Sequence, residues 1–227
     1  MTSAAVEGRA RNSRRDPELT KREILDAAAE EFSRHGAYGA KTEDIARRTN
    51  TTKRMIYYYF GSKEGLYAAV LRENYVRVRE LEVHLHLEVH EPVEALRILI
   101  RATLDHYERY PELARIVGME NLIKQGKTAE HLEGMGELNR SAPETLAEIL
   151  KRGREAGVFR SDESAPSALD VHQVLSALTL NRVEHQATFK IAFGRDMLRG
   201  EDGAHVRRLI EDTVLRLVLA DPAVLER

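Results

Sequence analysis

Amphipathic segments of helix length, punctuated by single Gly and Pro residues, recur along this chain. In the first of them Ile24, Ala28 and Phe32 stand four residues apart and therefore share one apolar helix face. Gly36 is placed to end that helix, and Pro92 and Pro111 fit the first position of later ones. No stretch shows the alternation of polar and apolar residues that marks a half-buried strand. These amphipathic segments, separated by Gly and Pro, therefore predict an all-α fold.

Two short helical segments and then a long one follow the first helix. Thr42 is the predicted N-cap of the first segment, and Asn50 stands in the turn that ends it, where a left-handed conformation is tolerated. Thr52 is the predicted N-cap of the next helix, which runs to about Phe60. Ser62 then caps a helix expected from Lys63 to about Glu88. Later helices are expected at 111–124, 128–156 (with Pro143 as a candidate break), 166–193 and 203–219.

The composition removes several classes of site. The 227 residues include no cysteine, which excludes disulfides, thiol catalysis and cysteine zinc sites and fits a reducing compartment. Residues 1–18 lack the apolar stretch of a signal peptide, and Arg97 and Arg216 interrupt the longest apolar runs. We therefore expect a cytoplasmic protein with no membrane partner.

The charge is divided unevenly along the chain. Through Lys63 there are 13 Lys and Arg against 9 Asp and Glu, a net +4, whereas the remainder carries a net −6. Residues 1–18, which hold Arg9, Arg11, Arg14 and Arg15, are expected to form a disordered basic arm. The arm could contact phosphates or a minor groove, or be an ordinary solvated tail. The asymmetry predicts a polyanionic partner for the front of the chain.

The segment TNTTKRMIYYYF, residues 49–60, carries an unusual aromatic run. On a helical wheel Ile56, Tyr59 and Phe60 cluster on one side, while Arg54 and Tyr58 centre the other. Met55 and Tyr57 flank that second face, and Lys53 lies at its edge. Guanidinium, ammonium and phenol groups suit phosphates and base edges in a major groove, so a helix-turn-helix is indicated. On spacing alone, an ordinary helical corner with a solvated face remains the alternative.

A resemblance to a known family covers residues 19–71. This stretch resembles the DNA-binding domain of the TetR family of transcriptional regulators through the elements "IL-AA-E-F---G", "T--DIA" and "K--IYYYF-SKE-L". The resemblance implies double-stranded operator DNA as a partner. It also implies DNA-contacting roles for Thr42, Thr51, Thr52, Lys53, Arg54, Met55, Tyr57, Tyr58, Tyr59 and Lys63. Asn50, Arg54 and Met55 depart from the residues usual in the family, and the last two alter which bases can be read.

The same resemblance implies the organisation of the whole chain. Residues 19–65 are expected to form a three-helix helix-turn-helix domain, and residues 66–227 a helical domain that binds an effector and dimerises. Apolar stripes support homodimerisation through a four-helix bundle. The expected interface residues are Leu175, Leu178, Arg182, Leu209, Ile210, Val214 and Leu217. The alternative is that both stripes pack inside one subunit.

Polar and aromatic residues on otherwise apolar helices are candidates for contact with a small-molecule effector. They are His106, Tyr107, Glu120, Asn121, Arg182, His185 and Phe189. Segments 110–122 and 181–194 also resemble regulators that sense small nitrogenous or carboxylated catabolites. An anionic or polar-aromatic effector is expected, because Arg182, His106 and His185 could orient it while Phe189 and Tyr107 supply an apolar wall. His86 and His90 stand four apart, a spacing that can bind a metal, although a packed or solvated helix end is the simpler interpretation. No cofactor is expected.

Three functions are compatible with the sequence. The leading one is a homodimeric repressor released by an effector. An enzyme is disfavoured because the sequence shows no Gly-rich phosphate loop, nucleophile elbow or metal triad. The third keeps the DNA binding but makes the protein an activator or an architectural binder.

Overall fold

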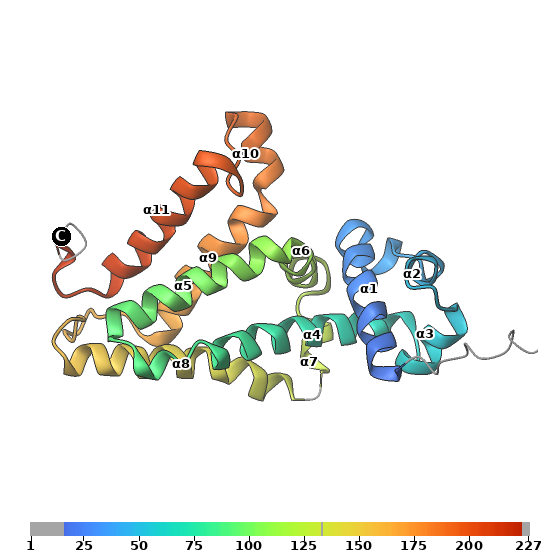
Figure 1. The fold of residues 1–227 in the computed structure, drawn as a ribbon, viewed down its shortest axis with the longest axis horizontal. Coiled ribbons are helices and arrows are strands. Elements are labelled where there is room, and N and C mark those ends of the chain that lie inside the picture. Colours follow the sequence, from blue (N-terminus) through green and yellow to red (C-terminus); the bar gives the residue numbers. More distant parts are fainter. Residues whose placement is uncertain (1–15, 133, 224–227) are drawn as a thin grey trace, which may run out of the picture. The chain divides into compact units, whose positions relative to one another are not determined.

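The computed structural model describes residues 16–132 and 134–223, and within them the chain is almost entirely helical. The helices are α1 (Pro17–Gly39), α2 (Thr42–Arg48), α3 (Lys53–Phe60), α4 (Lys63–His84), α5 (Pro92–Arg109), α6 (Pro111–Met119), α7 (Lys127–Glu130), α8 (Met135–Glu155), α9 (Ala168–Glu184), α10 (Gln186–Phe193) and α11 (Gly200–Val218). A 3₁₀ turn, Leu87–Val89, and a π-helical turn, Glu120–Lys124, complete the order (Figure 1). The predicted all-α class is confirmed. The chain forms two compact units, Met1–Tyr67 and Ala68–Arg227.

The first helix begins earlier than the sequence pattern suggested. The Asp16 side chain accepts a hydrogen bond from the Glu18 N–H, and Pro17 takes the first helical position, where its missing N–H costs nothing. The expectation of a disordered arm over residues 1–18 is therefore wrong at residues 17 and 18, and residues 1–15 lie outside the described part. Gly36, with φ of 68°, breaks α1 near its end, as a helix-ending glycine should.

The first unit is built on a small apolar core. Ile24, Phe32, Ile45 and Ile56 are fully buried and bring α1, α2 and α3 together. Phe32 also meets the edge of the Tyr67 ring, with the two ring centroids 5.1 Å apart. Burying each such side chain contributes roughly 1.5–3 kcal/mol to folding. This core fixes the orientation of α3, which supplies only Ile56 to it as a fully buried residue.

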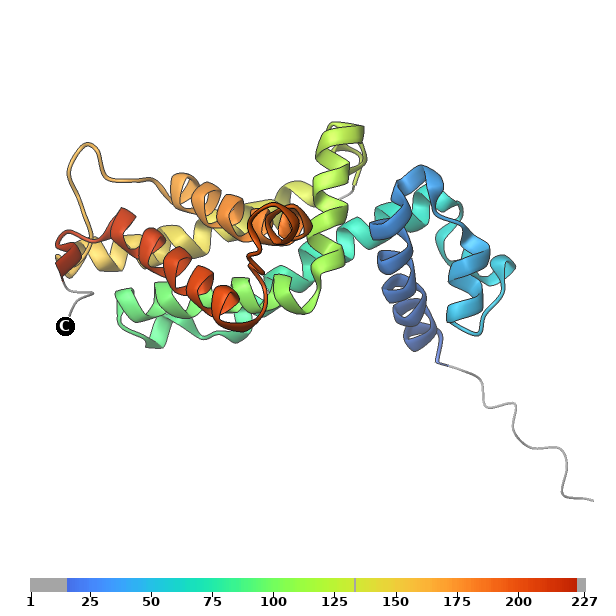
Figure 2. The same ribbon diagram turned by 90° about the horizontal axis from the view of Figure 1, so that it is seen from above.

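The second unit centres on four packed helices, α5, α8, α9 and α11 (Figures 1 and 2). Their buried side chains form one continuous apolar cluster that reaches from Leu87 to Leu219. Phe159 and Leu219 also form an isolated antiparallel bridge. None of the described members of the cluster comes from α4. The buried residues of α4 are Leu66, Tyr67, Val70, Leu71 and Asn74, and its half-buried residues include the ion pair between Arg79 and Glu82.

Several predicted boundaries need correction. Pro143 lies inside α8, and the break in the expected helix 128–156 falls instead at Gly134, whose φ of 74° favours glycine. The expected helix 166–193 is divided at His185 into α9 and α10. The helix expected to run to Glu88 ends at His84, because His86 adopts a left-handed conformation with φ of 47°. His86 and His90 therefore do not share a helix face.

The described helices offer neither a membrane span nor a cluster of metal ligands. None of the described helices is long and apolar enough to cross a bilayer. Within residues 16–132 and 134–223, no three His, Asp or Glu side chains gather closely enough to hold a metal ion.

Candidate nucleic-acid interface

A tight turn connects α2 to α3 and sets the direction of the second helix. Asn50 holds this turn with φ of 51°, the left-handed conformation expected at this position. The Thr52 hydroxyl accepts a hydrogen bond from the Met55 N–H, which confirms Thr52 as the N-cap of α3. Gly61, with φ of 74°, ends the helix. The local sequence therefore builds a helix-turn-helix whose second helix has defined ends.

The two faces of α3 have the predicted character. Ile56 is fully buried, whereas Arg54 is exposed and Tyr58 is 77% exposed. Tyr57 is exposed and Met55 half-buried beside them, and Tyr59 lies half-buried at the rim, where its ring stands 5.3 Å from that of Tyr58. The outward face thus presents one guanidinium and two phenols with apolar support. These groups can donate to phosphates and to base edges in a major groove.

A depression of about 600 Å³ adjoins this face. It is lined by the end of α1, the start of α2, part of α3 and the turn into α4, and it contains Lys41, Lys53 and Lys63. The Lys53 ammonium lies 5.6 Å from the centre of the Tyr57 ring and 2.6 Å from Glu43 Oε1. Three ammonium groups around one basin suit the sugar–phosphate backbone of a duplex.

Thr42 and Lys63 differ in detail from their expected roles. The N-cap of α2 is Lys41 and not Thr42, which is the first helical residue and is almost fully buried. The Thr42 hydroxyl lies 3.4 Å from the Tyr57 hydroxyl and so connects α2 to α3. Lys63 donates to the carbonyl oxygens of Tyr38, at 2.9 Å, and Ala40, at 3.3 Å. Without DNA this lysine therefore caps the end of α1.

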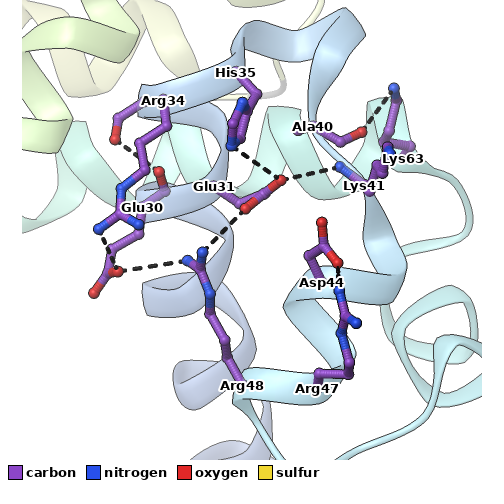
Figure 3. A network of polar contacts seen from close by, with 11 residues as sticks. Glu30, Glu31, Arg34, His35, Ala40, Lys41, Asp44, Arg47, Arg48 and Lys63 are labelled. Atoms are coloured by element: carbon purple, nitrogen blue, oxygen red, sulfur yellow. Dashed lines mark hydrogen bonds and ion pairs between the residues drawn. The ribbon is translucent and has the colours of Figure 1, made fainter.

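A buried carboxylate holds α2 against α1 (Figure 3). Glu31 of α1 is 2% exposed, and its Oε2 lies 3.3 Å from Nη2 of Arg48 in α2. Its Oε1 accepts from the Lys41 N–H at 3.3 Å, and His35 Nε2 approaches it at 3.8 Å. Sequence reasoning gave Glu31 no role, although an acidic residue on the apolar face of the first helix is a usable signal of a buried ion pair.

The candidate effector residues are scattered over the second unit. Asn121 and His185 are exposed and form hydrogen bonds with residues four positions earlier, Val117 and Asn181. Phe189 packs partly against the apolar cluster and stacks edge-on with Phe193. Glu120 is buried, with Oε1 accepting from the Thr128 N–H. None of these four lines the groove of the second unit that contains His106.

A groove of about 560 Å³ lies between α4 and α5. Of the seven candidates only His106 is among its lining residues, which are Arg77, Glu80, Leu81, His84, Leu85, Ala102, Asp105, His106, Arg109 and Tyr110. Burial, aided by the charge of Arg77, lowers the pKa of His106 to about 4, so its imidazole is neutral at pH 7. Its Nε2 atom has no hydrogen-bond partner among the described residues. Tyr107, whose pKa burial raises to about 12, stacks edge-on against the imidazole, with centroids 5.2 Å apart.

Most expected dimer residues lie inside a single subunit. Leu175, Ile210 and Val214 belong to the apolar cluster, and Leu178 and Leu217 pack against it. Arg182 is 2% exposed and donates to Glu108 and to the carbonyl oxygen of Met197. Leu209 is 52% exposed on α11, and Leu178 and Leu217 are half-buried. Packing within one subunit therefore accounts for Leu175, Arg182, Ile210 and Val214, and the assignment of the others to a dimer interface stays a prediction.

Comparisons with known proteins agree with this geometry. Residues 24–70 match the family model "Bacterial regulatory proteins, tetR family", and residues 92–214 match "Tetracyclin repressor-like, C-terminal domain". The transcriptional repressor NicS of Pseudomonas putida is 38% identical over 143 residues, which cover 63% of this chain and 67% of that protein. The repressor SCO4008 of Streptomyces coelicolor is 34% identical over 157 residues, which cover 68% of this chain and 75% of that protein.

Solved structures show the same fold. The ketosteroid regulator KstR2 of Mycobacterium tuberculosis superimposes with a TM-score of 0.66 at 19% identity, covering 88% of this chain and 95% of that one. A putative transcriptional regulator of Streptomyces coelicolor, SCO4942, gives a TM-score of 0.64 at 22% identity, covering 88% and 98%. With a C-terminal match that spans more than half of the chain, a helix-turn-helix match and relatives above 30% identity, the chain belongs to the TetR family of DNA-binding transcriptional regulators, which are not enzymes.

Proposed function

We propose that this regulator is a homodimeric repressor that binds a palindromic operator and is released by a small-molecule effector. In this proposal residues 19–65 bind DNA and residues 66–227 dimerise and bind the effector. The outward face of α3, with Arg54 and Tyr58 exposed beside a basin of lysines, is the observation that carries the DNA-binding part. Repression is favoured because the relatives NicS and SCO4008 are both named as repressors.

The proposed interface gives each residue a distinct task. Arg54, Met55 and Tyr58 read bases, because they lie on the outward face of α3. Thr51, Thr52, Tyr57 and Tyr59 lie at its edges and contact the backbone. Lys53 and Lys63 contact phosphates, and Thr42 supports them from the start of α2. Lys63 would exchange the carbonyl oxygens of Tyr38 and Ala40 for a phosphate oxygen on binding.

Replacing Arg54 with alanine tests the base-reading role. The Arg54→Ala variant should lose about 1–3 kcal/mol of operator binding and become indifferent to one base position in each half-site. Because Arg54 is exposed, the fold should be unaffected. Fluorescence anisotropy with the operator and with single-base variants of it measures both effects. Lys63→Ala is the comparison, since a lost phosphate contact weakens binding to all sequences alike and lowers the salt slope by about one. Undiminished selectivity in Arg54→Ala would show that α3 is oriented differently on DNA.

The groove between α4 and α5 is the proposed effector site. It offers the guanidinium groups of Arg77 and Arg109, the neutral imidazole of His106 and the apolar side chains of Leu81 and Leu85. This set suits a planar, polar-aromatic molecule with a carboxylate. α4 is the natural lever, because its first residues belong to the DNA-binding unit and its remainder to the second unit. An effector must prefer the form of the protein that does not fit the operator, because a ligand shifts only an equilibrium between states it distinguishes.

Aromatic and heterocyclic carboxylic acids should therefore raise the melting temperature and weaken operator binding together. In the His106→Phe variant, which keeps the ring and removes Nε2, both responses should be lost while operator binding without effector is retained. His185→Phe, outside the groove, should respond as the parent does. Thermal-shift assays followed by anisotropy on the operator measure both responses. A response lost in His185→Phe and kept in His106→Phe would move the site to the junction of α9 and α10.

A further inference from the structure

Two acidic residues, Glu43 and Glu64, line the DNA-facing basin of the first unit, and Glu43 is the one that contacts Lys53. Glu43 stands in the first turn of α2, and its Oε1 lies 2.6 Å from the Lys53 Nζ atom. Its Oε2 accepts a hydrogen bond from the Thr42 hydroxyl at 3.3 Å. A single carboxylate therefore engages two of the groups that the proposed interface offers to the DNA backbone.

This arrangement reproduces the way proteins hold phosphate. A phosphate oxygen, like a carboxylate oxygen, is an anionic acceptor that takes hydrogen bonds from ammonium and hydroxyl groups. The hydrogen bond from Lys53 lowers the pKa of Glu43, so the carboxylate is ionised at neutral pH. The Tyr57 ring, 5.6 Å from Lys53 Nζ, confines the ammonium on another side. Lys53 is thus held in the basin by an internal anion before DNA arrives.

We propose that Glu43 is a specificity-determining residue, whose carboxylate occupies the position of a DNA phosphate in the free protein. Only a duplex whose phosphates contact Lys53 and Thr42 together displaces it. The inference rests on the proposed DNA interface. Every duplex that approaches must separate Lys53 from Glu43 or bring a phosphate close to the carboxylate, and both cost free energy. At the operator, the base contacts of α3 fix the register and place phosphates on Lys53 and Thr42, which offsets that cost. An unrelated duplex lacks this register and brings phosphates near the carboxylate without replacing it on Lys53 and Thr42, so it bears more of the cost of the Glu43 charge than the operator does.

The Glu43→Gln variant tests the inference, because it keeps the shape of the side chain and removes its charge. Binding of an unrelated duplex should strengthen about fivefold, the Boltzmann factor for two unit charges about 4 Å apart in water. Its salt slope should steepen by about one, as Lys53 becomes free to replace one more counterion. Operator binding should strengthen less, so the ratio of operator to unrelated affinity should fall. Anisotropy titrations with both duplexes over a range of salt give all these quantities, and circular dichroism checks the fold.

Glu64→Gln is the matched control, because Glu64 is exposed and lines the same basin, while no hydrogen bond or ion pair within the described part of the chain joins it to Lys53 or Thr42. It removes the same charge and should change binding of the unrelated duplex by less than half the factor seen for Glu43→Gln. In a Lys53→Gln background, Glu43→Gln should have almost no further effect. Equal gains from the two glutamate variants, or a gain that survives in that background, would overturn the proposal. A parent protein that fails to distinguish operator from unrelated DNA would instead refute the interface itself.

Discussion

Glu108→Ala should lower the free energy of unfolding by about 3 kcal/mol, the lower end of the loss seen when one partner of a buried ion pair is removed. Arg182 on α9 is 2% exposed, and its guanidinium bonds to Glu108 of α5 and to the Met197 carbonyl oxygen. Without Glu108 the buried positive charge keeps only that neutral acceptor. The lower end of the range applies because Glu108 itself is 26% exposed, so water reaches part of the site.

Two control variants separate the contribution of the Glu108–Arg182 pair from that of the Glu108–Arg207 pair. Glu108 also pairs with Arg207 at 2.8 Å, and the Arg207→Ala variant should lose no more than about 1 kcal/mol, as partly exposed pairs do. Glu108→Gln keeps an acceptor for Arg182 and should be intermediate. Urea unfolding followed by circular dichroism gives the three free energies. A Glu108→Ala variant as stable as Arg207→Ala would mean that water or a rearranged side chain satisfies Arg182.

Sequence reasoning succeeded best where structure is set by neighbouring residues. The sidedness of α3, the Thr52 cap and the left-handed Asn50 all follow from side chains a few positions apart, and all three agree with the structure. The family resemblance added the identity of the partner, which spacing alone left open against a solvated helical corner. In the first unit, the predicted helix boundaries were displaced by only one to three residues, as at Thr42 and at the start of α1.

Sequence reasoning could not show which distant residues meet. Arg182 was assigned to both the effector pocket and the dimer interface, yet its partners, Glu108 and Met197, come from other parts of the second unit. Polar residues on apolar helices can be recognised from sequence, but whether a buried partner already satisfies them cannot. The groove beside His106 could not be foreseen either, since its arginines lie on α4 and α5, whose relative packing no sequence period determines.

The apolar face of α11, expected at the dimer interface, also shows that a sequence pattern does not reveal which residues meet. Its exposed part allows a sharper test of dimerisation. An apolar helix stripe of α11 looks alike whether it packs against its own subunit or against a second copy, and most of it is buried within one subunit. Ile210 and Val214 are therefore unsuitable for testing dimerisation, because a charge at either would disrupt the apolar cluster. Leu209 is 52% exposed on the same helix, so a charge there can disturb an interface without disturbing the core.

Leu209→Arg should convert the proposed dimer to a folded monomer and weaken operator binding by about 10²–10⁴-fold, the gain that linking two sites ordinarily provides. A two-fold dimer places its recognition helices about 34–36 Å apart on an inverted repeat, and a monomer engages only one half-site. The variant should therefore bind the full repeat no better than an isolated half-site, which the parent binds weakly. Light scattering gives the oligomeric state, and anisotropy with the two duplexes gives the affinities. Thr213→Arg, one helical turn away and also exposed, shows whether the sensitive surface extends along α11 or is confined to Leu209. A Leu209→Arg protein that remains dimeric with full affinity would move the interface to another face, whereas a monomer with full affinity would refute the requirement for a dimer.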